Sequence, residues 1–204
     1  MLQIRVVGPF EVLAGGVQVE MPPSRKTRAL LAYLALADRP VRRERLCEIF
    51  WELPDDPKGA LRWSLSKIRR AVNGDGADRI LSDRSVVALD RAGVGVDWLD
   101  LRQAAADGLE DLPDARLEAL AATLRGGFLE DLDLSRCPDY EAWRLGEAAQ
   151  VEAAAARLLR LLVERLEGEP GRALPHALRL RAFVPDPEEA DALVARLRQG
   201  VGRR

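Results

Sequence analysis

The sequence predicts an α+β N-terminal part followed by an all-α part, and three observations support this division. The 204 residues are 48% hydrophobic and 31% charged, which is typical of a soluble globular protein. Strand-like and helix-like patterns alternate over residues 1–91, whereas residues 96–204 show only helical periodicity. The charge changes at the same place: residues 1–91 have a net charge of +4, and residues 92–204 have a net charge of −6. We therefore expect two domains, 1–91 and 96–204, joined by a short Gly-containing segment.

The first domain is expected to begin with short strands. Apolar residues alternate over 2–7, and the segments 11–13 and 17–19 flank Ala14-Gly15-Gly16, which predicts a hairpin. Three helices and a second hairpin follow. The helices are expected at 27–37, with Ser24 as the N-cap, at 43–51 and at 58–72, and the hairpin strands at 79–81 and 86–89.

The second domain is expected to be a string of helices. Their periodicity places them at 97–106, 114–124, 139–167, 172–183 and 187–198. Short turns with Gly or Pro separate them, which predicts antiparallel neighbours in a layered, tetratricopeptide-like array.

The helix at 58–72 carries the strongest functional signal. It contains five basic residues and no acidic one, and its apolar residues Leu61, Leu65, Ile68 and Val72 share one narrow face. The opposite face presents Trp63, Ser66, Lys67 and Arg70, with Arg62 and Arg69 at its flanks. Like charges at this spacing repel one another, so their accumulation indicates a polyanionic partner such as DNA. A basic surface helix without a ligand is the alternative interpretation.

The order of elements favours DNA. Two helices joined by a turn, the second of them basic, and then a hairpin with Arg79 and Arg84 is the layout of a winged helix-turn-helix. In this layout the basic helix enters the major groove, the helix before it braces against the DNA backbone, and the hairpin reaches the minor groove.

The sequence also resembles a known family. The segments 2–12, 28–35, 40–46, Phe50-Trp51 and 61–70 look like the OmpR-type winged helix of the bacterial SARP-like transcriptional activators. The second domain of that family is a bacterial transcriptional activation domain of tetratricopeptide-like helices. Its landmarks are matched here by Val96-Asp97, by 124–129 and by Trp143.

The resemblance implies a transcriptional regulator that binds double-stranded promoter repeats and contacts RNA polymerase. The polymerase-contact loop corresponds to Glu52, Leu53, Pro54, Asp55, Asp56 and Pro57. The resemblance and the pattern of basic residues together give the expected DNA-binding residues: Lys58, Arg62, Trp63, Ser66, Lys67, Arg69, Arg70, Arg42, Arg79 and Arg84. The helical domain is expected to mediate either homodimerisation or the contact with RNA polymerase.

Two features depart from the family pattern. Arg42 stands where the family often has Ser or Thr, so it either leaves a weak helix cap or contacts a phosphate. The sequence ends at Arg204 just after a helix that needs a packing partner, which predicts either a truncated regulator or further domains beyond this point.

Other function classes lack support. We expect no enzyme, cofactor, metal, small-molecule substrate or membrane partner, because the sequence shows no nucleophile–base pair, ligand cluster, phosphate loop or long apolar segment. His176 and Cys47 are interpreted as packing residues, Cys137 as a loop residue, and the acidic residues near Phe128, namely Glu130, Asp131 and Asp133, as a loop surface without basic partners. Two distant cysteines indicate a cytoplasmic protein. The rival hypothesis is a helical-repeat adaptor whose winged helix binds protein.

Overall fold

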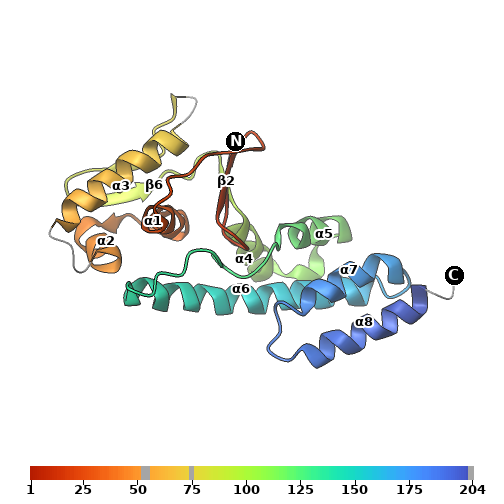
Figure 1. Cartoon of the computed structure of the whole chain (residues 1–204). Helices are drawn as coiled ribbons and strands as arrows, with labels where there is room; N and C mark the ends of the chain where they lie inside the picture. Colours follow the sequence, from red (N-terminus) through yellow and green to blue (C-terminus); the bar gives the residue numbers. More distant parts are fainter. Residues whose placement is uncertain (52–55, 74–75, 202–204) are drawn as a thin grey trace.

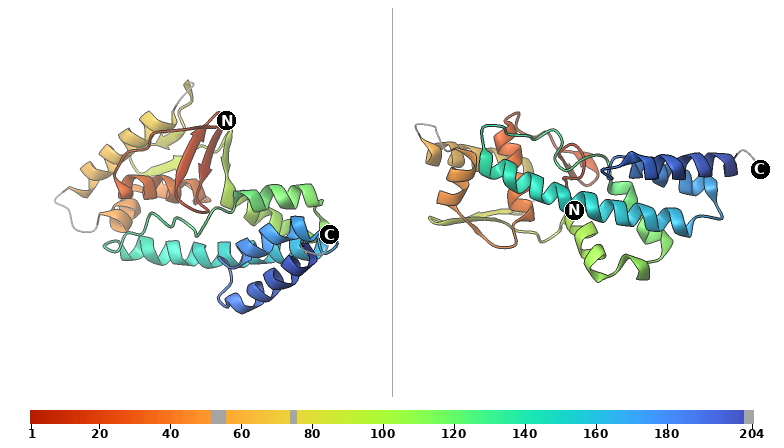
Figure 2. Two further views of the ribbon diagram at one scale, coloured as in Figure 1. Left: turned by 45° about the vertical axis from the view of Figure 1, so that its right-hand side comes forward. Right: turned by 90° about the horizontal axis from the view of Figure 1, so that it is seen from below.

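The computed structural model describes residues 1–51, 56–73 and 76–201 (Figure 1). The N-terminal α/β region lies at one end of an elongated molecule, and the last two helices lie at the other (Figures 1 and 2). A long helix, α6 (Pro138–Arg165), runs beneath both parts and connects them. The predicted order of an α+β region and then a helical region is confirmed.

The first sheet contains β1 (Leu2–Arg5), β2 (Glu11–Ala14), β3 (Val17–Gln18) and β7 (Val94–Val96), in the order β3-β2-β1-β7. The hairpin between β2 and β3 turns at Gly15 and Gly16, whose φ angles of 59° and 86° suit glycine. Strand β7 pairs in parallel with β1. It falls in the segment that we expected only to join the domains, because three residues are too few to show a strand pattern.

The winged-helix elements follow the predicted order. They are α1 (Arg25–Leu36), β4 (Val41–Arg42), α2 (Arg43–Phe50), α3 (Pro57–Val72), β5 (Ile80–Ser82) and β6 (Val86–Leu89). The side chain of Ser24 caps α1 by accepting a hydrogen bond from the N–H of Thr27 at 3.3 Å, as expected. Strands β4, β6 and β5 form an antiparallel sheet in that order, so the second hairpin gains a third strand that the sequence did not indicate.

The buried face of α3 fixes this helix in the core. Its predicted inward residues Leu61, Leu65, Ile68 and Val72 are all buried. Ser64 is buried as well, and its hydroxyl lies 3.0 Å from the hydroxyl of Thr27 on α1. This polar pair satisfies two buried hydroxyls and fixes the register between α1 and α3.

The helical half consists of α4 (Asp97–Asp107), the short 3-10 helix η2 (Leu109–Asp111), α5 (Asp114–Thr123), α6, α7 (Pro170–Leu180) and α8 (Pro187–Val201). The helix positions match the sequence prediction to within a few residues. Helix α6 packs against α4, α5 and α7, and α7 packs against α8. Among the described residues, no helix is both long enough and apolar enough to cross a bilayer.

The two halves meet at Asp97, which is 7% exposed. Its carboxylate accepts hydrogen bonds from the N–H of Val6 at 2.9 Å, of Val7 at 3.2 Å and of Trp98 at 2.8 Å. Burial raises the pKa of the Asp97 carboxyl above its ordinary value, and these three bonds counteract part of that rise. One side chain at the start of α4 therefore accepts hydrogen bonds from the backbone N–H groups that follow β1.

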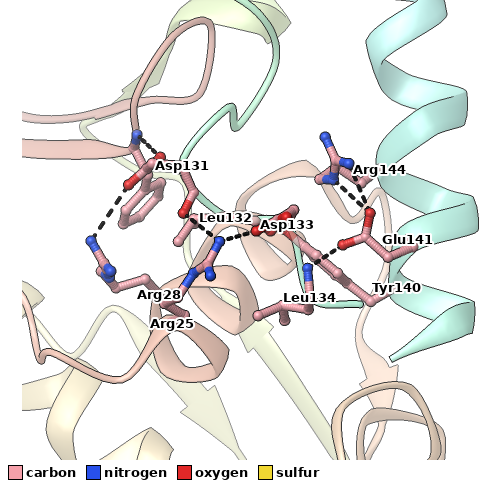
Figure 3. Close-up of polar contacts among 10 residues, drawn as sticks. Arg25, Arg28, Asp131, Leu132, Asp133, Leu134, Tyr140, Glu141 and Arg144 are labelled. Carbon is pink, nitrogen blue, oxygen red and sulfur yellow. Dashed lines mark hydrogen bonds and ion pairs between the residues drawn. The ribbon is translucent and has the colours of Figure 1, made fainter. Parts of the chain in front are cut away.

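An acidic segment between α5 and α6 forms a second connection (Figure 3). Asp131 accepts from the N–H of Phe10 at 2.7 Å and pairs with Arg28 of α1 at 3.5 Å, while Asp133 pairs with Arg25. Expecting Asp131 and Asp133 to be a loop surface without basic partners was therefore wrong. Their partners lie more than a hundred residues away, so no local pattern could reveal them.

An aromatic cluster fills the space between α1, α2 and the start of α6. Tyr33 and Trp143 have ring centroids 4.8 Å apart, and Phe50 and Tyr140 are 5.3 Å apart. Such pairs each contribute about 0.5–1.5 kcal/mol beyond area burial. Cys137, which we expected in a loop, is buried at the start of α6 and directs its thiol at the carbonyl of Phe50. The winged helix is thus held against the helical half by both polar and apolar contacts.

Replacing Asp97 tests the polar joint. In Asp97→Ala, the N–H groups of Val6, Val7 and Trp98 lose their acceptor in a dry environment, so we expect the free energy of unfolding to fall by about 3 kcal/mol. Asp97→Asn keeps one acceptor oxygen and should lose less. Urea unfolding measures both, with Asp100→Ala on the exposed side of α4 as the control. Equal stability of the Asp97→Ala and Asp100→Ala proteins would contradict the role of Asp97.

His176 predicts a pH dependence of stability. It is 9% exposed on α7, and its Nδ1 has no hydrogen-bond partner among the described residues. Burial lowers its pKa, and of the charges that face it, Glu118 opposes this while Arg179 and Arg172 add to it. Since the folded protein favours the neutral ring, the stability present above the ordinary pKa of about 6.5 is lost as the pH falls below it.

The substitution His176→Leu removes this titration. Thermal unfolding between pH 7.5 and 5 should therefore show a steeper loss of stability in the wild type than in the variant. Because His176 is the only histidine of the sequence, no other imidazole contributes to the difference. Parallel curves for the two proteins would show that protonation of His176 does not destabilise the folded protein.

Candidate nucleic-acid interface

The outer face of α3 carries most of the predicted DNA-binding side chains. Lys58, Arg62, Trp63, Ser66 and Arg70 are exposed, and Lys67 is half-buried. The apolar face of the same helix lies in the core, so the backbone of α3 is fixed while these side chains extend into solvent. In Figure 1 this helix lies at the end of the molecule remote from α7 and α8. The structure therefore brings these six residues together on one accessible surface.

The N-terminus of α3 is well defined. Asp56 accepts a hydrogen bond from the N–H of Gly59 at 2.7 Å, and Pro57 occupies the first turn, where a missing N–H costs nothing. Arg62 lies 3.6 Å from the same carboxylate, but both side chains are 65% exposed. An exposed pair of this kind contributes about 0–1 kcal/mol, so Arg62 can exchange Asp56 for a phosphate at little cost. Of the expected polymerase-contact loop, Glu52, Leu53, Pro54 and Asp55 lie outside the described residues.

Two predicted DNA contacts instead connect α3 to the hairpin. Arg69 donates to the carbonyl of Ile80 at 3.2 Å and to the hydroxyl of Ser82 at 2.6 Å. Arg79 donates to the carbonyl of Val72 at the end of α3. Both guanidinium groups thus position β5 beside α3. The spacing of basic residues could not separate these two arginines from those that point outward, because their acceptors are backbone and hydroxyl oxygens.

The β5–β6 turn presents Arg84 to solvent. Asp83 shapes this turn, because its carboxylate accepts from the N–H groups of Ser85 at 2.6 Å and Val86 at 2.8 Å. These bonds lower the pKa of Asp83 and keep the turn closed with Arg84 at its tip. Asp83 was not predicted as a site residue, although an Asp two residues before a Ser in a hairpin turn is a recognisable Asx signal.

Arg42 lies on the sheet next to this turn. It precedes α2 as the N-cap, makes no side-chain capping bond, and pairs through its backbone with Val86 of β6. Its side chain is exposed. The weak cap expected from the sequence is present, and Arg42 is left available to a partner beside the hairpin.

Ion pairs are fewer on this surface than in the helical half. There, many arginines pair with carboxylates: Arg157 with Glu110 at 2.7 Å, Arg160 with Glu189 at 2.8 Å, and Arg165 with Asp114 at 2.9 Å. In contrast, Lys58, Lys67 and Arg70 form no ion pair with any described acidic residue. The positive charge of α3 is therefore left largely uncompensated within the described chain.

Lys67 has a different neighbour. Its ammonium group lies 5.2 Å from the ring centroid of Trp63, one helical turn earlier, in a cation–π contact. Trp63 itself is 51% exposed, whereas Trp98 is 2% and Trp51 is 7% exposed. Trp63 therefore lies on the outer face of α3, as its position on the helix predicted, whereas Trp98 and Trp51 lie in the core.

The chemistry available on this face is recognition of anions. Guanidinium and ammonium groups on a rigid helix can bind phosphates, and an Arg can also donate to the O6 and N7 atoms of guanine. Among the described residues, no three His, Cys, Asp or Glu side chains gather closely enough to hold a metal ion.

Comparisons with known proteins support the fold. No protein-family model matches the chain, and no curated protein matches it. Among solved structures, it is similar to Mycobacterium tuberculosis EmbR in complex with a low affinity phosphopeptide, with a TM-score of 0.56 and 20% sequence identity. The match covers 98% of this chain and 65% of that one. At this identity the similarity shows a shared fold, and it confirms the architecture expected from the resemblance to the SARP-like activators: a winged helix-turn-helix followed by a helical part.

Proposed function

We propose that this chain is a transcriptional regulator that binds duplex DNA with α3 and with the β5–β6 hairpin. The observation that carries the proposal is the largely uncompensated positive charge on the outer face of α3, whereas many arginines of the helical half pair with carboxylates. A cationic helix that is buried on one side and exposed on the other suits a major groove.

The roles differ among the residues. Arg62, Ser66 and Arg70 occupy the middle of the exposed face, where an inserted helix meets the base edges. Lys58 lies in the first turn of α3, Arg42 on β4 beside β6, and Arg84 at the β5–β6 turn, and these three are proposed to contact phosphates. Arg69 and Arg79 act indirectly, because they hold the hairpin at a fixed position beside α3.

The helical half is proposed to serve assembly. Its net charge of −6 does not suit DNA, and its stacked helices present surfaces that suit a second copy or RNA polymerase. In this proposal the protein activates transcription by joining a promoter repeat to the polymerase. The loop at 52–57 is the proposed polymerase contact from the DNA-binding side.

Substitutions on α3 test DNA binding. Random duplexes enriched by repeated rounds of binding supply the probe, and fluorescence anisotropy measures the affinity. Arg62→Ala and Arg70→Ala should each weaken binding by about 1–3 kcal/mol if they contact bases. Arg116→Ala removes an equally exposed cation from α5 and should leave the affinity unchanged. If the α3 variants and the α5 variant bind alike, α3 is not the interface.

Salt dependence is an independent test of the same proposal. Contact with three or four phosphates predicts a slope of about −3 to −4 when the logarithm of the association constant is plotted against that of salt concentration. A flat plot, or the absence of duplex binding by the folded protein, would contradict DNA binding. A protein partner captured by the same face would then favour the adaptor hypothesis.

A further inference from the structure

A groove of about 350 Å³ runs along one flank of α3. One wall is α3 itself, with Trp63, Lys67 and Arg70, and the other is the segment that leads into α1, with Pro22 and Pro23. Arg69 bonds to β5, and Trp63 and Lys67 project from the other side of the exposed face. The groove therefore lies on the flank of α3 away from the hairpin.

The walls of the groove combine two chemistries. Trp63, Pro22 and Pro23 supply apolar surface, and Lys67 and Arg70 supply positive charge that no described carboxylate neutralises by ion pairing. The cation–π contact holds the ammonium group of Lys67 near the Trp63 ring, at the boundary between the two surfaces. Glu20 is the acidic residue of the lining, and its side chain is exposed.

The dimensions of DNA indicate what such a groove meets. The major groove is about 12 Å wide, and a helix with its side chains is about 10–12 Å in diameter. A helix inserted there touches a sugar-phosphate strand on each flank. On one flank of α3 the hairpin is placed to meet the first strand, so the opposite flank faces the second.

We propose that this groove holds the sugar-phosphate backbone of the DNA strand that borders the major groove on the side away from the hairpin. Lys67 binds its phosphates, while Trp63 and the Pro22-Pro23 wall pack against deoxyribose. The inference rests on the proposed function and extends it to residues before α1. With this contact, the protein binds the backbones of both DNA strands that border one recognition helix.

Fluorescence quenching tests the position of Trp63. Acrylamide quenches exposed tryptophans, and the difference between the wild type and Trp63→Phe isolates the Trp63 signal. Saturation with the enriched duplex should remove at least half of the quenching of Trp63. If the duplex binds with the expected salt slope but Trp63 stays fully quenchable, the groove assignment is overturned and the proposed function stands. If no duplex binds, both fail.

Charge substitutions test the phosphates. Lys67→Gln should weaken duplex binding about 5- to 10-fold at low salt and make the salt slope less steep by about 1. Glu20→Gln removes the opposing charge and should strengthen binding about 2-fold, a gain that partial unfolding cannot produce. Glu152→Gln on the exposed side of α6 is the matched control and should change nothing. An unchanged slope for Lys67→Gln, or equal affinities for the Glu20 and Glu152 variants, would overturn the assignment.

Discussion

Asp97 is the residue on which the relative position of the two halves depends, because its buried carboxylate bonds to backbone from both sides of the junction. It accepts from Val6 and Val7 after β1 and from Trp98 within α4, while β7, directly before it, pairs with β1. A buried carboxylate is costly unless such bonds surround it. The junction is therefore a fixed joint, although its sequence has the Gly content of a linker.

The other connections reinforce this joint. Asp131 and Asp133 hold α1 through Arg28 and Arg25 (Figure 3), and the aromatic cluster fills the space between α1, α2 and the start of α6. Their combined effect is that α3 has a defined direction relative to the helical half. In the proposed function, this direction determines where the helical half lies when α3 is in the major groove. The whole-chain charge of −2 is uninformative because many arginines pair with nearby carboxylates, whereas Lys58, Lys67 and Arg70 on α3 pair with no described one.

The sequence predicts the elements better than their connections. Helical periodicity placed α3 and its buried face correctly, since Leu61, Leu65 and Ile68 repeat at helical spacing. The short strands β4 and β7 escaped prediction, because strands of two or three residues exist only through their partners. Within the site, composition identified the basic helix but could not show that Arg69 and Arg79 bond to the hairpin and the end of α3. The groove beside Trp63 was equally hidden, since its far wall, Pro22-Pro23, lies forty residues earlier in the sequence.

The most direct test of the central claim uses the lysines of the sequence. These are Lys26, Lys58 and Lys67, and the latter two lie on α3. Acetylation followed by mass spectrometry measures the reactivity of each lysine, with the exposed α-amino group of Met1 as the internal reference. If α3 binds DNA, saturating duplex will suppress acetylation of Lys58 and Lys67 several-fold and leave Met1 unchanged. Equal reactivity of Lys58 and Lys67 in free and duplex-bound protein would contradict the assignment of α3 as the DNA-binding element.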